Sequence, residues 1–331
     1  MNRMTIASRG AASAALLAAL AACGGGSSAP PAPPAEPSAL FVANAHTGDV
    51  AGFAMLSPPA GSTTSGHDVA SLASMDGPLA YDSVHDLLYV ATTPPATPSD
   101  NSARIQVFNH ASQLTAGATP ARAISLEDSV GVESMTVDGA SDTLWVFYRY
   151  QIFTPLDGAV ISRVGSASTA TTSLDFVLTL GPWTESATYD PVRDVVYATD
   201  GSGVVVLSQA SASKYWLVAP TQEFGAGIDG VALASDSSRD IVYVADGAGS
   251  GVRLMLGAST ASPTFVGPVP LPAAPSSVAV DMANDRLYVS AGGKVYVFDH
   301  ASTLTAASAS PAPAIVGAGG DRFWFSGSTI R

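Results

Sequence analysis

The chain has 331 residues and a formal net charge of −13, from 14 Lys and Arg against 27 Asp and Glu. Hydrophobic residues make up 47% and charged residues 12%, which provides for a large buried core and argues against extensive disorder. An acidic surface repels a phosphate backbone, so we expect no nucleic acid partner. The single cysteine excludes disulfides within the chain and multi-cysteine metal sites.

The first 22 residues have the pattern of a signal peptide. Arg3 and Arg9 provide a positive start, and residues 10–22 form an apolar stretch that is too short to span a membrane. The following Leu20-Ala21-Ala22-Cys23 resembles the bacterial lipobox, in which the cysteine thiol is acylated and the cysteine becomes the new N-terminus. We therefore expect residues 1–22 to be a lipoprotein signal peptide and Cys23 to be lipidated. An ordinary secretory signal with a chance cysteine is the alternative.

Residues 23–38 are expected to be the lipidated cysteine and a tether. Residues 24–38 are rich in Gly and Ser and then in Pro, a composition that cannot bury a core. Gly24, where an Asp would be a retention signal, resembles the Gram-negative pattern for sorting to the outer membrane. This resemblance implies a domain anchored to that membrane by lipid, in the periplasm or at the cell surface.

Five segments of the chain resemble one another, which indicates an internal repeat. Each has a short alternating strand, a polar turn and a second strand centred on an aromatic residue. The segments are Leu79–Ala91, Met135–Phe147, Ala187–Thr199, Val231–Ala245 and Val278–Ser290. Their aromatics are Tyr89, Trp145, Tyr197, Tyr243 and Tyr288, at spacings of 56, 52, 46 and 45 residues. These spacings are typical of the four-stranded blades of a β-propeller.

The rest of the chain fits the same repeat. Third strands are expected at Ile105–Ser112, Val204–Ser211 and Val295–Ser302, followed by short outer strands. The segment Ala39–Met55 resembles second and third strands with no first strand before them, and Asp321–Arg331 supplies an extra strand at the other end. We predict that the two ends share one blade, which gives a single all-β propeller over residues 39–331 with six blades. Seven blades are the alternative, because Asp321 and Trp324 also have the spacing of a second strand.

The stretches Val280–Val289 and Val297–Thr305 carry a family resemblance. They resemble bacterial NHL-like or YVTN-like β-propeller lipoproteins over roughly residues 39–331. The resemblance implies the propeller fold and leaves the activity open, because such propellers include binding modules and enzymes.

Several residues that could carry chemistry are better explained as turn residues. One aspartate recurs at the end of each first strand and another four residues later, which is the frequency of a turn residue and not of a catalytic group. These are Asp82, Asp138, Asp190 and Asp281, with Asp86, Asp142, Asp194, Asp240 and Asp285. The equivalent His110 and His300 indicate a turn role as well, and His46, His67 and His85 lack the spacing of metal ligands.

A literal GxGxxG pattern at Gly225–Gly230 has the wrong context for a dinucleotide. Such a loop must follow a strand and open a helix, whereas this one precedes a strand in an all-β sequence. We predict a loop between two blades.

Acidic residues recur just before the first strands. They are Asp76, Glu133, Glu185 and Asp229. Because first strands line the channel of a propeller, these four carboxylates are expected to form an acidic rim at one channel mouth. Carboxylate oxygens suit Ca²⁺ or another hard divalent cation, and a cationic or sugar-like ligand is equally permitted. The alternative is a set of solvated loop carboxylates.

The sequence favours a non-enzymatic binding or scaffold module for an envelope protein or a small ligand, acting as a monomer. It contains no GxSxG, Walker, HExxH or EF-hand motif and no firm cofactor signature. The alternative is a lactonase-like hydrolase in which Glu133, Glu185 and Asp229 hold a channel cation that polarises a carbonyl. A quinone or haem dehydrogenase ranks last, because the chain has no CxxCH motif.

Overall fold

The structure is a computed structural model of the whole chain. It describes residues 40–44, 49–53, 67–71, 77–92, 102–126, 129, 131–149, 156–162, 164–165, 176–179, 184–212, 222–249, 251–316 and 323–325. By its internal contacts the chain divides into residues 1–36 and a compact unit of residues 37–331. The fold below is that of the second unit. No helix within the described ranges is long and apolar enough to cross a membrane.

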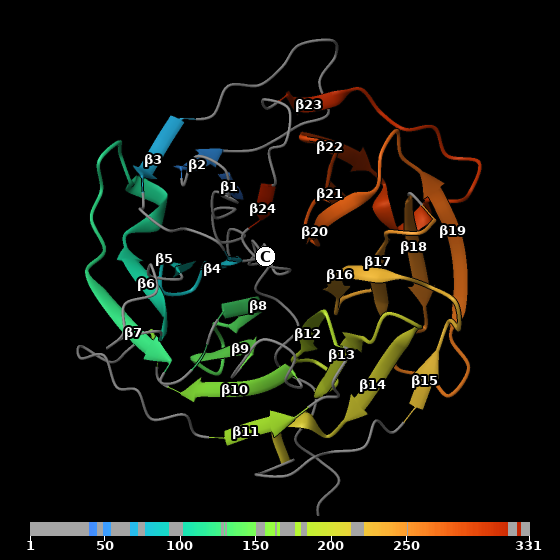
Figure 1. Cartoon of the computed structure of the whole chain (residues 1–331), viewed down its shortest axis with the longest axis horizontal. Helices are drawn as coiled ribbons and strands as arrows, with labels where there is room; N and C mark the ends of the chain where they lie inside the picture. The colour runs from blue at the N-terminus through green and yellow to red at the C-terminus, as the bar shows by residue number, and fades with distance from the viewer. Residues whose placement is uncertain are drawn as a thin grey trace, which may run out of the picture. The chain divides into compact units, whose positions relative to one another are not determined.

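The described residues form six four-stranded antiparallel sheets, which we call blades 1 to 6. Figure 1 shows them arranged around a common centre. Blade 1 contains β24 (Phe323–Phe325), β1 (Leu40–Asn44), β2 (Asp49–Phe53) and β3 (His67–Ser71). Blade 2 contains β4 (Leu79–Asp82), β5 (Leu87–Thr92), β6 (Ala103–Asn109) and β7 (Arg122–Leu126). Blade 3 contains β8 (Gly131–Asp138), β9 (Thr143–Arg149), β10 (Leu156–Ser162) and β11 (Phe176–Thr179).

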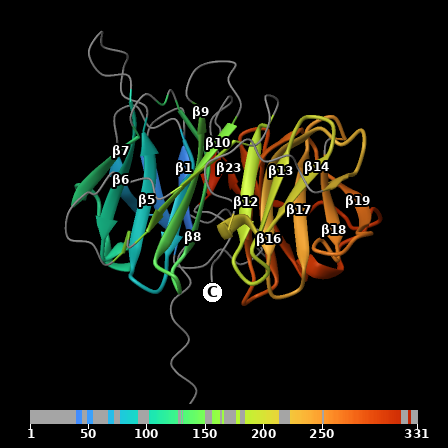
Figure 2. The ribbon, with the colours of Figure 1, turned by 90° about the horizontal axis from the view of Figure 1, so that it is seen from below.

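The second half of the chain repeats this order. Blade 4 contains β12 (Ser186–Asp190), β13 (Val195–Thr199), β14 (Val204–Ser208) and β15 (Gln222–Phe224). Blade 5 contains β16 (Gly230–Asp236), β17 (Ile241–Asp246), β18 (Gly251–Leu256) and β19 (Thr264–Pro270). Blade 6 contains β20 (Pro275–Asp281), β21 (Arg286–Ala291), β22 (Lys294–Asp299) and β23 (Pro313–Val316). The predicted all-β propeller is confirmed, and its strands run between the two faces of the ring (Figure 2).

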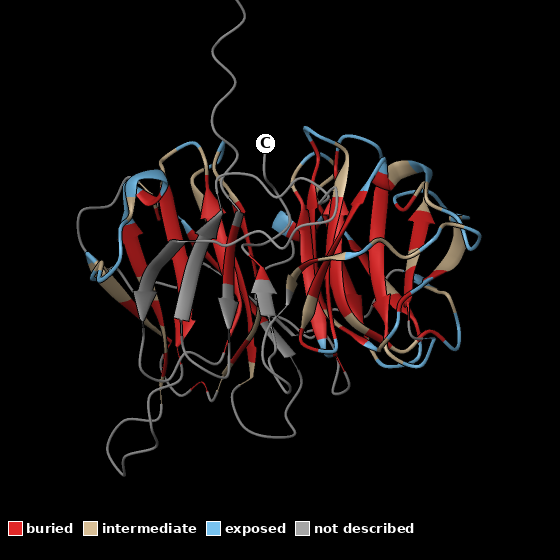
Figure 3. Cartoon of the chain, turned by 90° about the horizontal axis from the view of Figure 1, so that it is seen from above, coloured by how far each residue is buried: buried red, intermediate tan, exposed pale blue. Residues whose placement is uncertain are grey.

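Burial is greatest in the second strands and decreases toward the outer strands. The second strands are rich in Val, Ile and Tyr, which favour strands, and β5, β13 and β17 are buried at every position. Both faces of each second strand are covered by neighbouring blades, so the sequence of these strands is apolar without alternation. The third strand β6 alternates between buried and half-buried residues, and the outer strand β15 is mostly exposed. Figure 3 shows this core inside the ring and the exposed turns on both faces.

Blade 1 joins the two ends of the described fold. Strand β24 pairs with β1 in antiparallel register, with Val42 opposite Phe325 and Asn44 opposite Phe323. Phe325 is 4% exposed and its ring lies 6.4 Å from that of Tyr288 in blade 6. On the other side, the ring of Phe41 lies 5.2 Å from that of Tyr81 in blade 2. The strand predicted near the C-terminus therefore completes the sheet begun at the N-terminal end.

The turn between the first and second strands of blades 2 to 6 follows one pattern, Asp-x-x-x-Asp. In blade 2, Asp82 Oδ1 accepts the backbone N–H groups of Val84 and His85, and Asp82 Oδ2 lies 2.7 Å from His85 Nδ1. The second aspartate has the left-handed conformation, with a φ of 54° at Asp86. Its carboxylate accepts the backbone N–H and the hydroxyl of Ser112, which follow the third strand. The predicted turn role of these aspartates is confirmed.

Blades 4 to 6 repeat this pattern, and in blade 3 Asp142 accepts the backbone N–H of Gly165 instead. Serines that donate to the second aspartate are Ser211 to Asp194, Ser259 to Asp240 and Ser302 to Asp285. Asp236 in blade 5 is a first aspartate that the sequence comparison missed, because its unit begins two residues earlier than the others. His110 and His300 lie before the short 3₁₀ turns η1 (Ala111–Gln113) and η3 (Ala301–Thr303), each with a φ of 53°. Their predicted turn role is confirmed.

The structure also tests the predicted ends of the third strands and the predicted loop at Gly225–Gly230. The third strands end earlier than predicted, because the Ala-Ser pairs that follow them belong to the 3₁₀ turns, including η2 (Ala210–Ala212). The GxGxxG segment is confirmed as a loop, since it connects β15 to β16. Gly225 and Gly227 have φ values of +72° and +87°, which favour glycine.

Candidate functional site: the central channel

The innermost strands of the six blades surround the centre of the ring (Figure 1). Their hydroxyl contacts keep the same order along the chain, with Thr136 on β8 bonded to Thr188 on β12 at 3.3 Å and Thr188 to Ser235 on β16 at 3.3 Å. Ser134 on β8 also contacts Ala187 on β12, and Arg193 after the end of β12 contacts Ser237 after the end of β16, so the three strands run in the same direction. We call the end where the innermost strands begin the acidic face, and the end with the Asp-x-x-x-Asp turns the turn face.

A cavity lies between the innermost strands, in the half of the channel nearer the acidic face. Its free space, counted out to open solvent, is about 400 Å³. All six innermost strands contribute to its wall. Each innermost strand contributes one apolar residue at the equivalent position. In every blade this residue pairs with the second-strand residue that follows the central aromatic. These residues, which we call the apolar ring, are Leu79, Met135, Ala187, Leu233, Val278 and Phe325.

Hydroxyl groups line the cavity beside the apolar ring. Ser134 Oγ accepts the backbone N–H of Ala187 at 3.1 Å, which ties β8 to β12. Ser186 and Ser277 also line the cavity and are 5% and 6% exposed. Within the part of the chain that the structure describes, neither of these two hydroxyls has a hydrogen-bond partner. Their oxygen atoms stay accessible from the cavity, so both hydroxyls are available to a ligand or to water.

Glu133 lines the same cavity and is held from blade 3. It lies in β8 where the register with β9 shifts between Val132 and Ser134. Its Oε1 accepts the Nε–H of Arg149 on β9 at 3.0 Å, and Arg149 also donates from its guanidinium to the carbonyl of Thr184 at 2.6 Å. Arg149 therefore fixes the Glu133 carboxylate at the cavity and joins blade 3 to the start of blade 4.

Glu185 and Asp229 directly precede β12 and β16 at the acidic face. Neither is part of an ion pair among the described residues. Partial burial raises the pKa of the Glu185 carboxyl, and the charge of Asp229 raises it further. Arg149 acts in the opposite direction, and Glu133 adds a smaller increase. The three predicted carboxylates thus lie close enough to interact, with Arg149 as the basic residue among them.

The fourth predicted rim residue, Asp76, lies outside the described residues. Within the described ranges, no group of three or more His, Cys, Asp or Glu side chains has an arrangement that could hold a metal ion. The predicted Ca²⁺ site therefore stays a prediction. The alternative hydrolase needs the same ligands, Glu133, Glu185 and Asp229, and nothing further in the geometry favours it.

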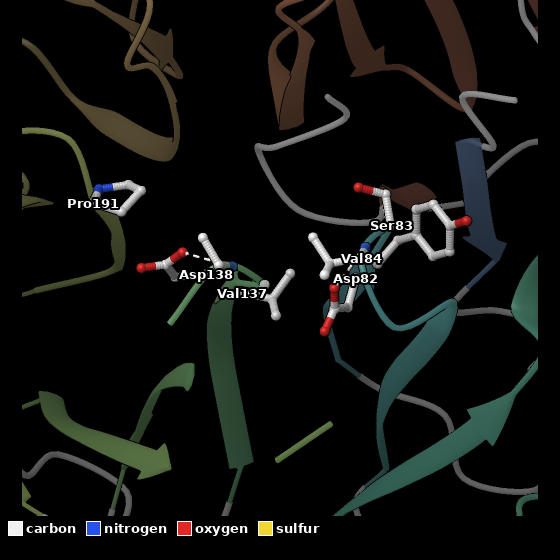
Figure 4. Close-up of a pocket in the computed structure, with 9 residues that line it drawn as sticks. Asp82, Ser83, Val84, Val137, Asp138 and Pro191 are labelled. Carbon is white, nitrogen blue, oxygen red and sulfur yellow. Dashed lines mark hydrogen bonds between the residues drawn. The ribbon is translucent and has the colours of Figure 1, made fainter. Parts of the chain in front are cut away.

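A second hollow lies at the turn face, with about 310 Å³ of free space counted out to solvent. Figure 4 shows Val84 and Val137 between the aspartates Asp82 and Asp138 that start two of the turns. Both aspartates already accept hydrogen bonds from their own turns. Val84 is 57% exposed, so this hollow is open and partly apolar.

Sequence comparison of the repeats identified the acidic residues of the site but missed its hydroxyls and its apolar ring. Ser186 and Ser277 lie near the starts of the innermost strands β12 and β20, directly after Glu185 and Ser276. A signal was present, since Ser occurs at this position in blades 3, 4 and 6 as Ser134, Ser186 and Ser277. It could be interpreted only after the strands had been assigned to the channel wall.

Comparison with known proteins supports the fold and no more. No protein-family model matches the chain. No curated protein matches it either. A chain in the crystal structure of the nidogen/laminin complex is 13% identical with a TM-score of 0.54, and the match covers 80% of this chain and 91% of that one. A functionally unknown protein from Desulfotomaculum acetoxidans DSM 771 is 12% identical with a TM-score of 0.52, covering 79% and 75%. At such identities the likeness concerns architecture alone: the chain is an all-β propeller.

Proposed function

We propose that this chain is a non-enzymatic binding module whose ligand enters the central channel from the acidic face. The observation that carries the proposal is the cavity between the innermost strands, with Glu133 in its wall and Glu185 close enough to interact with both Glu133 and Asp229. A concave site lined by carboxylates attracts and orients cationic groups, because its field is focused by the low-dielectric walls. The nidogen/laminin complex, in which a chain of similar fold takes part in a protein complex, is consistent with this use of the fold.

We further propose that the six described sheets are the complete ring. Closure through β24 and β1 supports this count, because it leaves the innermost strands of blades 6 and 2 on either side of the joined sheet. The cavity is then walled on all sides and open toward the acidic face.

The proposed location of the protein is the bacterial envelope, to which a lipid on Cys23 anchors it. The basis is the signal-like residues 1–22 and the lipobox-like Leu20–Cys23. In a Gram-negative host, the full-length protein is expected in the outer-membrane fraction and labelled by radioactive palmitate. The Cys23→Ala variant is expected to lose both properties. Equal membrane retention of the two proteins would refute the anchor and would leave the channel proposal untouched.

The binding proposal is tested by thermal unfolding of the full-length protein with a panel of small solutes sorted by charge. Calcium, magnesium, alkylamines and polyamines form the cationic set, with alcohols and carboxylates of equal size as neutral and anionic sets. At least one cation is expected to raise the melting temperature, because a ligand that binds only the folded state stabilises it.

The channel origin of this effect is tested by variants. In Glu133→Gln/Glu185→Gln the rise should disappear. The matched control is Glu223→Gln, which removes one carboxylate from the exposed outer strand β15 and should keep the rise. A panel without any stabilising cation, or a rise that survives in the double variant, would overturn the proposal.

A further inference from the structure

We propose that the channel mouth binds an alkylammonium group, with the charged nitrogen at Glu133 and the alkyl chain against the apolar ring. This inference rests on the proposed function and names the chemistry of its ligand. The free amine and the side chain of a lysine share this chemistry, and the experiment below separates these two sources.

The first support is the set of hydrogen-bond groups that the fold leaves unused in the cavity wall. The Ser186 and Ser277 hydroxyls line the cavity, are more than nine-tenths buried and have no hydrogen-bond partner among the described residues. An ammonium group has three donors and no acceptor, so it can donate to hydroxyl and carboxylate oxygens together. Hydroxyl oxygens that face the cavity can accept a hydrogen bond from such a ligand in place of water.

The second support is the unused capacity of the Glu133 carboxylate. Arg149 donates to Oε1, and no other hydrogen bond or ion pair engages Glu133 in the described part of the chain. A carboxylate has about four acceptor positions, so Oε2 can accept from an ammonium while Arg149 stays in place. The Arg149 contact also holds the carboxylate in one orientation, which reduces the entropy that a ligand would lose on binding.

The third support is the apolar ring, which distinguishes an alkylammonium from a bare cation. A divalent metal ion needs oxygen ligands around its whole circumference. Here Leu79, Leu233 and Phe325 line the same cavity as Glu133, so a carboxylate and an apolar ring lie within reach of one ligand. An alkyl chain ending in an ammonium group matches both features. Each CH₂ that leaves water adds about 0.8 kcal/mol, or about fourfold in affinity.

The test is calorimetric titration of the full-length protein with ethylamine, butylamine and hexylamine. Affinity is expected to rise with chain length, up to about fourfold for each CH₂ that is buried. Hexanol and hexanoate, which lack the positive charge, should bind at least about tenfold more weakly than hexylamine. An affinity that is independent of chain length, or equal for hexylamine and hexanol, would overturn the inference.

Two substitutions localise the binding. Glu133→Gln should weaken hexylamine and leave hexanol unchanged. Val278→Thr keeps the side-chain shape but adds a hydroxyl to the apolar ring, and should reduce the dependence on chain length. The control Glu223→Gln on the outer strand should change neither. Circular dichroism of each variant checks that it is folded, so that a loss of binding is attributed to the site.

A further titration with N-acetyl-lysine amide and with a lysine-containing pentapeptide distinguishes a free amine from a lysine side chain as the natural ligand. A peptide that binds more tightly than hexylamine points to a protein partner that inserts a lysine, and a weaker one points to a free amine. If calcium or magnesium stabilises the protein through Glu133 while no amine does, the channel-binding proposal stands and the alkylammonium inference fails. If no cation of any kind binds, both fail.

Discussion

At the scale of single residues, tyrosine hydroxyls divide into two groups according to whether the turn provides a partner. Tyr189 donates to Asp194 Oδ1 at 3.1 Å, as Tyr81 does to Asp86 at 3.2 Å. Tyr89, Tyr197 and Tyr243 on the second strands are almost fully buried, and their hydroxyls have no partner among the described residues. Burial raises the pKa of Tyr243 far above its ordinary value, so this side chain stays neutral and contributes mainly through packing.

This difference leads to a paired prediction. Tyr189→Phe should lower the free energy of unfolding by about 1.5–3 kcal/mol, because it removes a hydrogen bond to a charged carboxylate. Tyr243→Phe should leave the stability unchanged or raise it, because no described contact is lost. Chemical denaturation of the two variants checks this. A Tyr243→Phe variant that is destabilised as much as Tyr189→Phe would contradict the assignment and indicate a buried water at that hydroxyl.

The acidic face gives a second residue-scale prediction, which concerns pH. The pKa of Glu185 is raised in the folded state, so its ionised form is disfavoured there. The penalty is absent below the unfolded pKa and appears as the pH rises through the folded pKa. Glu185→Gln should therefore raise the melting temperature at about pH 7 and have no effect near about pH 3, where the carboxyl is protonated in both states. An equal shift at both pH values would contradict the repulsion by Asp229 and Glu133.

At the scale of secondary-structure elements, the repeated turns connect the strands within a blade and the blades to each other. Arg193 contacts Asp190 in its own turn and the carbonyl of Ser237 in blade 5. Arg239 repeats this arrangement toward Met282 in blade 6. In blade 2 the equivalent residue is His85. Its ring lies so close to Gly165 of blade 3 that a Cβ added at Gly165 would be only 2.7 Å from it. The turn arginines of blades 4 and 5 thus connect each of these blades to the next one at the turn face.

A strand of only three residues closes the ring. Strand β24 spans Phe323–Phe325 and provides the fourth strand of blade 1. A truncation after residue 322 is expected to lower the melting temperature strongly, because it exposes the edge of β1 and removes Phe325 from the core shared with Tyr288. A truncation after residue 325 keeps β24 and is the matched control. If differential scanning calorimetry gave equal melting temperatures for both, closure through β24 would be wrong.

The repeat made most of these elements predictable from the sequence. The aromatic at the centre of each second strand and the aspartate three residues before it recur in five segments, so that the strands of those blades could be placed. Blade 1 was predictable because its strands at the two chain ends were incomplete without each other. The contact that anchors the Ala-Ser turns was not predictable, since the hydrogen bond from Ser112 to Asp86 spans 26 residues and leaves no local pattern.

The candidate site was less predictable, for a physical reason. Glu133, Glu185 and Asp229 could be chosen because charge is rare in this chain and their position before a first strand recurs. Ser186 and Ser277 could not, because whether a serine hydroxyl has a partner depends on the neighbouring blade and not on its own sequence. The arginine that pairs with Glu133 lies 16 residues away on β9, outside any local motif.

At the scale of the whole molecule, the two faces of the ring have different chemistry. The turn face is consolidated by hydrogen bonds from aspartates to turns and by arginines between blades. The acidic face holds carboxylates with few basic partners among the described residues, and it opens onto a cavity whose Ser186 and Ser277 hydroxyls have no partner in the described part of the chain. A fold that satisfies its polar groups at one end and leaves them available at the other directs ligand binding to the second end.

The most direct test of this account is a crystal structure of the full-length protein with the cation that stabilises it best. We predict density for the ligand between the innermost strands, with its charged group within hydrogen-bond distance of Glu133. Density at the turn face beside Val84, or a bound cation far from the channel, would contradict the assignment of the acidic face as the binding site.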